Sequence, residues 1–243
     1  SPDQFDYRLN ADVRADGTIK IKLERQEIDV SKIRPTTFTL PGMAVDGFRS
    51  ADFDKGSYTY ETTLRAVLKL PEKAPLDDYL AIGPLDFSLY FFKLANPTAS
   101  TLKRFPQKKF DVSKRRSWLK ASGGIRLYRD GFRVRPYGEP NSQGSDWLLL
   151  GERVARNPAQ ASRPGWRVPP QQLAGTIHIT KEDNPALADQ SNREGIMNER
   201  AFATFRAIVL GLISEFERDR AHIYSQFDKA YDLDHPEETQ VAA

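Results

Sequence analysis

The chain has 243 residues, with 36 Lys and Arg against 33 Asp and Glu, and a formal net charge of +3. It contains no cysteine, which excludes disulfides, thiolate catalysis and cysteine-ligated metal sites. Its three histidines, His178, His222 and His235, lack the paired spacing of a zinc-binding helix, so we expect no metal. No apolar run approaches the ~20 residues of a membrane-spanning helix and no signal peptide is visible, which predicts a folded cytoplasmic protein without membrane contact. The first residue is not Met, so we expect a piece of a longer protein.

Charge is unevenly distributed along the chain. Between residues 103 and 135 only Asp111 and Asp130 oppose twelve basic residues. A segment this basic attracts polyanions, either nucleic acid or the phosphates of a nucleotide. The alternative is a solvated face that acidic neighbours balance, and the residues alone leave both interpretations open.

The first half of the chain predicts mostly strands. Residues 5–13 and 18–23 alternate apolar and polar side chains around Asp16-Gly17, which indicates a β-hairpin. Residues 31–57 are rich in Pro and Gly and predict an irregular excursion. Residues 58–70 favour a strand at their start, from their Thr and Tyr content, but Leu64, Val67 and Leu68 also suit a helix. The aromatic run 83–92 predicts a central strand.

A polar loop is expected over 96–109, and a short helix over 111–122. Asp111 or Ser113 would cap this helix, with Val112, Arg116 and Leu119 on one face.

A second hairpin is expected over 125–137, turning at Asp130-Gly131. Its arginines alternate with apolar residues, which predicts one buried and one cationic face. A long turn-rich loop over 138–170 and a strand over 173–180 follow.

The final helix is expected to begin near Asn198, a residue type that caps helices, and to carry a core-facing apolar stripe. The stripe consists of Phe202, Phe205, Val209, Leu212, Phe216, Ile223 and Phe227.

Residues 189–196 precede that helix and are rich in Asp, Ser and Asn, the residue types that cap a helix. Arg193 would lie beside the free backbone N–H groups of the first turn, a position suited to an anion, and its guanidinium matches phosphate oxygens. The alternative is that Arg193 pairs with Glu194 or Glu199 on the surface. The chain has no phosphate-binding Gly-rich loop and no nucleophile elbow, so the residues alone support an α+β domain with an anion-attracting surface.

Several motifs follow in a fixed order, at 123–138, 146–148, 173–179 and 184–195. In this order they resemble the transducer region of bacterial ATPases related to MORC proteins, within the superfamily of gyrase B, MutL, histidine kinases and the heat-shock chaperone (GHKL). The chaperone's middle domain has an Asn-x-Ser-Arg-Glu segment whose arginine contacts the γ-phosphate of ATP. Here Arg193-Glu194 matches its Arg-Glu pair, and Gln190 stands where the chaperone has its Asn.

The resemblance implies the α+β fold of domain two of ribosomal small-subunit protein five. That fold has a mostly antiparallel four-stranded sheet with helices on one face and a left-handed β-α-β crossover, an exception to the right-handed rule. To it we add an N-terminal β-hairpin and a long C-terminal helix. The expected division is a β-rich segment over 1–80 that links to or completes the transducer, the transducer over 81–230, and a disordered acidic tail over 231–243.

The resemblance also implies a function. Arg193 would be the catalytic residue and γ-phosphate sensor, and Gln190 and Asn192 would help to hold the nucleotide. ATP and Mg²⁺ would bind to the full-length protein and not to this piece. The ATP pocket needs a helix with a Glu-x-x-x-Asn spacing and a downstream Asp-x-Gly-x-Gly, but here that spacing, at Glu194–Asn198, precedes the expected final helix, and Asp-x-Gly-x-Gly does not occur. The expected partner is the protein's own N-terminal ATP-binding domain, and a role in DNA transactions or phage defence is implied.

Because MORC and MutL relatives act on DNA, the tentative nucleic-acid contacts are Lys114, Arg115, Arg116 and Arg133. Two other functions stay open. One is a stand-alone nucleic-acid-binding module, and the other is a module that forms a homodimer through its final helix, for which Ile223 is expected to be an exposed apolar position.

Overall fold

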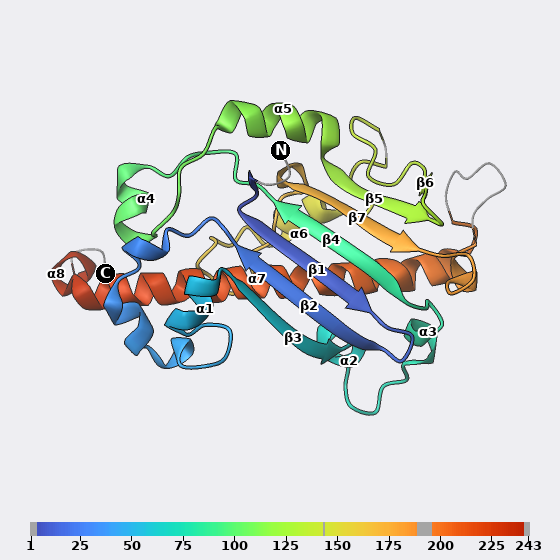
Figure 1. The fold of residues 1–243 in the computed structure, drawn as a ribbon, viewed down its shortest axis with the longest axis horizontal. Coiled ribbons are helices and arrows are strands. Elements are labelled where there is room, and N and C mark those ends of the chain that lie inside the picture. The colour runs from blue at the N-terminus through green and yellow to red at the C-terminus, as the bar shows by residue number, and fades with distance from the viewer. Residues whose placement is uncertain (1–3, 143, 189–195, 241–243) are drawn as a thin grey trace.

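One seven-stranded sheet organises the chain in the computed structural model, which describes residues 4–142, 144–188 and 196–240 (Figure 1). Neighbouring strands are antiparallel except for β5 and β7, which are parallel. In spatial order the strands are β3 (Ser57–Thr63), β2 (Thr18–Arg25), β1 (Tyr7–Val13), β4 (Leu85–Phe91), β7 (Leu173–Ile179), β5 (Gly124–Arg129) and β6 (Phe132–Val134).

The helices vary greatly in length, and α7 dominates them. They are α1 (Ser50–Lys55), α2 (Leu64–Val67), α3 (Asp77–Leu80), α4 (Ala99–Arg104), α5 (Val112–Ser122), α6 (Leu150–Arg156), α7 (Glu199–Asp234) and α8 (Pro236–Gln240). Among the helices in the described part of the chain, none is both long enough and apolar enough to cross a membrane.

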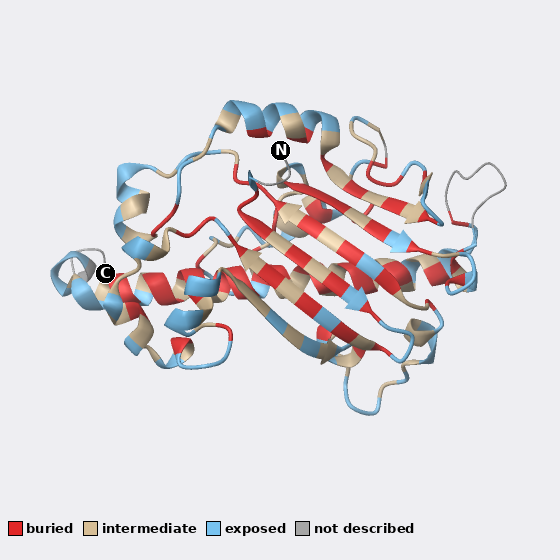
Figure 2. Ribbon diagram, in the orientation of Figure 1, coloured by how far each residue is buried: buried red, intermediate tan, exposed pale blue. Residues whose placement is uncertain are grey.

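Helix α7 runs across one face of the sheet, behind the central strands in the view of Figures 1 and 2. Phe205, Ile208, Val209, Leu212 and Phe216 are buried in the same core as the inward-facing strand residues. Burying each such side chain stabilises the fold by roughly 1.5–3 kcal/mol. The predicted apolar stripe therefore forms the main helix–sheet contact as far as Phe216, whereas its last two members, Ile223 and Phe227, pack in a separate cluster.

Helix α5 covers only one end of the opposite face. Leu119 packs there with Phe5, Phe92 and Ala174. Further along the strands this face is polar, because the strands alternate buried and solvent-facing residues (Figure 2). The transducer resemblance implied helices on one face of the sheet only, but here helices lie on both faces.

The predicted first hairpin is confirmed, and it extends the sheet. Strand β1 pairs with both β2 and β4, so residues 1–80 and 81–230 contribute strands to one continuous sheet of seven, and not of four, strands. The α+β class and the long C-terminal helix are also confirmed. The handedness of the crossover stays a prediction.

Several local predictions need correction. Residues 58–70 are both strand and helix, since β3 ends at Thr63 and the hydroxyl of Thr63 caps α2. Helices α4 and α6 lie inside the stretches predicted as loops. The sequence did not predict them, because both are too short to show a helical period of apolar residues.

In the predicted acidic tail, residues 231–234 are the end of α7 and residues 236–240 form α8; residues 241–243 lie outside the described part. Tyr231 is buried, and Arg104 pairs with Asp228 and Asp232 at 2.8 and 2.9 Å. The acids that suggested a solvated tail are thus partly neutralised by α4.

Candidate functional site

Arg193, Gln190 and Asn192 lie outside the described residues, so the structure does not show the predicted nucleotide contacts. It does show how both flanks of that segment are held. The Met197 backbone N–H donates to the Ala188 carbonyl at 2.9 Å, which closes the segment at its base. The Ile196 backbone N–H donates to the Tyr137 hydroxyl at 3.1 Å.

The C-terminal flank leads directly into α7. Asn198 caps this helix as predicted, its side-chain oxygen accepting from the Ala201 backbone N–H at 3.1 Å. One turn later the Phe202 ring lies 5.2 Å from the Tyr137 ring and 5.6 Å from the Trp147 ring. Residues 196–202 are therefore fixed to the segment that follows β6.

The N-terminal flank is held by the second hairpin. Arg129, on the buried face of β5, donates to the carbonyl of Leu187, which is fully buried. The Asp130-Gly131 turn predicted for this hairpin is present, and both residues have positive φ. The two flanks thus meet where the β5–β6 hairpin and the start of α7 lie together.

The middle of α7 is tied to the sheet by buried ion pairs. Arg25 contacts Asp219 at 2.6 Å, and Arg220 contacts Glu27 at 2.7 Å. Burial lowers the pKa of Arg25 to about 10, which leaves it charged at neutral pH, and raises the pKa of Asp219. Burial also acts to raise the pKa of Glu27, but Arg220 and Lys93 outweigh it and lower the pKa below its ordinary value.

A third buried acid joins α7 to the loop before β7. Glu217 has no exposed side-chain surface and contacts Arg153 at 2.9 Å and Arg167 at 3.5 Å. Burial raises the pKa of Glu217, while the two arginines and the Val168 backbone N–H oppose the shift. These pairs tie α7 to β2 and the residues after it, to α6 and to the loop before β7.

Helix α5 carries three of the four predicted nucleic-acid residues, and Arg115 is not available to a ligand. Its side chain is 8% exposed, and its guanidinium pairs with Asp6 and lies 3.6 Å from the centre of the Phe110 ring. Leu119, predicted on the inward face of α5, is buried there, but the residue buried with it is Arg115, and the predicted Arg116 is exposed. Arg115 therefore has a structural role, which corrects its assignment as a DNA contact.

Lys114 and Arg116 are exposed on α5, whose predicted cap Asp111 accepts from the Lys114 backbone N–H at 3.0 Å. Arg133 does not join them. It lies on β6 opposite Tyr128, towards the end of β5 that is farther from α5. Arg133 is half-buried, and its Nε and Nη2 atoms have no hydrogen-bond partner among the residues that the structure describes. The four predicted residues thus occupy two separate places.

Ile223, expected at an exposed dimer surface, is fully buried beside Met43, Phe53 and Phe227. A segment counted as irregular, residues 31–57, covers this part of α7 and supplies Met43 and Phe53. Ile223 is therefore a core position, and a charge placed there would test folding and not dimerisation.

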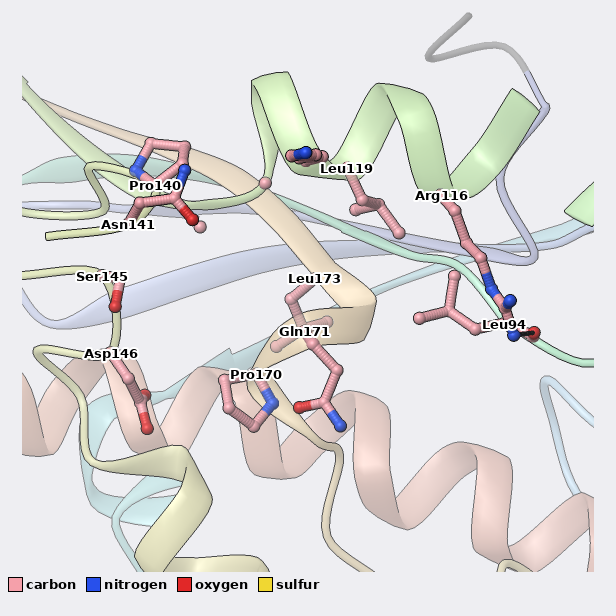
Figure 3. A pocket seen from close by; sticks show the side chains of 13 residues that line it. Leu94, Arg116, Leu119, Pro140, Asn141, Ser145, Asp146, Pro170, Gln171 and Leu173 are labelled. Atoms are coloured by element: carbon pink, nitrogen blue, oxygen red, sulfur yellow. Dashed lines mark hydrogen bonds between the residues drawn. The ribbon is translucent and has the colours of Figure 1, made fainter. Parts of the chain in front are cut away.

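Sequence reasoning missed a cavity of about 400 Å³ between α5, the 140–146 loop and the start of β7 (Figure 3). Figure 3 shows Arg116 and Leu119 descending from α5, with Asn141, Ser145 and Asp146 on the facing loop. Within the described ranges, no three His, Asp or Glu side chains gather in a way that could hold a metal.

The sequence matches no protein-family model and no curated protein. Among solved structures, the chain is similar to the B subunit of DNA gyrase from Myxococcus xanthus. The TM-score is 0.31 at 9% sequence identity, over 93% of this chain and 71% of that one. A likeness at this level assigns neither a family nor a function.

Proposed function

We propose that this chain is the transducer module of a GHKL-type ATPase, in which Arg193 contacts the γ-phosphate of ATP bound by a separate ATP-binding domain. The proposal rests on the resemblance of residues 184–195 to the family's arginine segment. One structural observation supports it: both flanks of 189–195 are fixed at the first turn of α7. A force on Arg193 would therefore act directly on that helix.

The length of α7 suits a relay. Its 36 residues span about 54 Å at 1.5 Å per residue, and its buried ion pairs with Arg25, Glu27 and Arg153 hold it to three distant segments. A helix held in this way moves with the sheet as one body, so a displacement of residues 196–202 is transmitted to the C-terminal end of α7.

Arg193 would stabilise the negative charge that develops on the transferred phosphoryl group, as arginine fingers do. Gln190 and Asn192 would orient the segment through their side-chain amides. ATP and Mg²⁺ are assigned to the ATP-binding domain, because the chain lacks that pocket's Asp-x-Gly-x-Gly motif.

The test is Arg193→Ala in the full-length protein that contains this chain. We expect ATP turnover to fall about 10³-fold, since arginine fingers contribute on the order of 10³–10⁵. ATP binding, measured by equilibrium titration, should change by less than about threefold, because its pocket lies in the other domain.

Arg200→Ala is the matched control. Arg200 lies near the start of α7, is exposed, and pairs with the exposed Asp78. Its loss removes the same charge from the same end of the helix without touching the proposed contact. Unchanged turnover in Arg193→Ala, or equal losses in both variants, would reject the proposal.

A second candidate function is nucleic-acid binding by α5, favoured by its exposed basic residues Lys114, Arg116 and Lys120. No acidic residue lies within α5 to oppose them. If α5 binds phosphates, each alanine substitution should weaken duplex DNA binding and reduce the salt slope by about 0.9 for each phosphate that is no longer neutralised. A salt-independent affinity, or no binding by this chain, would exclude this candidate.

A further inference from the structure

The cavity beside α5 has the size of a small-molecule site. Its volume of about 400 Å³ falls within the range of roughly 300–1,000 Å³ that ligand pockets occupy. Four separate stretches of chain converge on it: Leu94 after β4, α5 with the glycines that follow it, the 140–146 loop, and residues 170–173 at the start of β7 (Figure 3).

Its walls are largely apolar. The apolar side chains that line it are Leu94, Leu119, Pro140, Pro170 and Leu173. Gly123 and Gly124 also line it and leave the backbone uncovered where α5 passes into β5. Apolar walls of this kind exclude charged or fully hydrated groups and favour a flat hydrophobic body.

Two of the polar side chains around this apolar space are cations, Arg116 and Lys120. Arg116 and Lys120 lie one helical turn apart, so both can reach the same rim. Arg116 makes one hydrogen bond, from Nη2 to the Leu94 carbonyl at 3.2 Å. Within the described residues, Lys120 and Gln171 have no side-chain partner, and both therefore remain free to bind a ligand.

Asp146, the acid in the described lining, is already engaged. Its two carboxylate oxygens accept from the backbone N–H groups of Leu150 and Gly151, at 2.9 and 2.8 Å. These contacts at the start of α6 offset its charge. The two cations of α5 therefore dominate the local potential.

We propose that this cavity binds a small organic anion, with its apolar body between the leucine and proline side chains and its phosphate, carboxylate or sulfonate group at Lys120 and Arg116. Ser145 and Asn141, on the facing loop, can donate to polar groups on the body. This assignment gives part of the basic segment a ligand other than nucleic acid, and it is independent of the arginine segment at 189–195.

Anilinonaphthalene sulfonate is a suitable probe, since it joins an aromatic body to one anionic group. Fluorescence titration of the chain should show saturable binding of one probe molecule. Lys120→Ala should weaken it about tenfold, because a hydrogen bond to a charged group contributes about 1.5–3 kcal/mol and 1.4 kcal/mol is a factor of ten. Gln171→Trp should abolish binding by filling the cavity without removing a charge.

Lys114→Ala is the control, because Lys114 is exposed on the same helix and does not line the cavity. We expect its affinity for the probe to equal that of the wild type. The thermal midpoint of each variant verifies that it folds, and Lys120 is exposed enough that its substitution keeps the test valid if Gln171→Trp unfolds the chain.

Three results would overturn the proposal. They are wild-type affinity in Lys120→Ala, an equal loss in Lys114→Ala, and displacement of the probe by a stoichiometric short DNA duplex. The last would assign the cationic rim to nucleic acid. Failure of the duplex to displace the probe would support a dedicated small-anion site.

Discussion

Helices α5 and α7 both carry many charges, yet they use them in opposite ways. Lys114, Arg116 and Lys120 on α5 face solvent or the cavity, whereas Asp219 and Arg220 in the middle of α7 are buried. The difference lies in the partners. Arg25, at the end of β2, pairs with Asp219, which is 194 residues later in the sequence, and Glu27, two residues after β2, pairs with Arg220, which is 193 residues later. Within the described ranges, no acid pairs with the exposed side of α5.

This comparison shows that a charged residue on a helix becomes structural when the fold supplies a buried counter-charge, and stays available when it does not. A buried ion needs such a partner because removing it from water costs several kcal/mol. Arg115 illustrates the rule within α5 itself, since Asp6 pairs with it while its neighbours on either side remain exposed.

The largest expected effect is on α7. Arg220→Ala should lower the free energy of unfolding by about 3–5 kcal/mol, because it leaves the fully buried Glu27 without its main counter-charge. Urea denaturation followed by circular dichroism measures this. A loss of unfolding free energy below about 1 kcal/mol in Arg220→Ala would contradict the view that the charges of α7 are structural and those of α5 are not.

A change of pH is expected to alter the free energy of unfolding by less than Arg220→Ala does. The folded pKa of Glu27 is lower than its ordinary 4.5, since Arg220 and Lys93 outweigh the opposing effect of burial. Its ionised form therefore stabilises the fold above pH 4.5, and this contribution is lost as pH falls through the lower folded value.

Unfolding free energies measured at descending pH for the wild type and Glu27→Gln check this prediction. Asp6 and Tyr224 also face this carboxylate, and they are present in both proteins, so the difference between the two curves reports mainly on Glu27. If the two curves stay parallel below pH 4.5, the assignment is wrong.

Removal of the side-chain cap of α5 should lower the free energy of unfolding by a smaller amount again. Asp111→Ala should cost about 1 kcal/mol, because the Lys114 backbone N–H loses its acceptor. Asn198→Ala gives the matched measurement at the start of α7, where the side-chain oxygen accepts from Ala201. Chemical denaturation of both variants would show whether the two caps contribute equally, as their similar geometry predicts.

The smallest effect is expected at the exposed face of α5. Lys114→Ala should change the free energy of unfolding by less than about 0.5 kcal/mol, since surface substitutions away from buried partners usually do. Differential scanning calorimetry at low and high salt would measure it. A loss comparable with that of Arg220→Ala would mean that α5 has a structural partner in solution.

The sequence by itself determined the local elements that depend on short-range rules. The first hairpin follows from period-two alternation around Asp16-Gly17, and the second from Asp130-Gly131. The starts of α5 and α7 follow from side-chain caps at Asp111 and Asn198, since a cap acts over three residues and is legible in the sequence.

The tertiary structure alone decided which charges are buried and which form a site. The partners of Arg115, Asp219 and Arg220 come from distant segments, and no local pattern encodes that meeting. The cavity beside α5 likewise exists only because the 140–146 loop is brought against the helix. Ion pairing and side-chain burial depend on contacts between distant segments, so the sequence could not predict them. Helix capping and strand alternation depend on neighbouring residues, so it could.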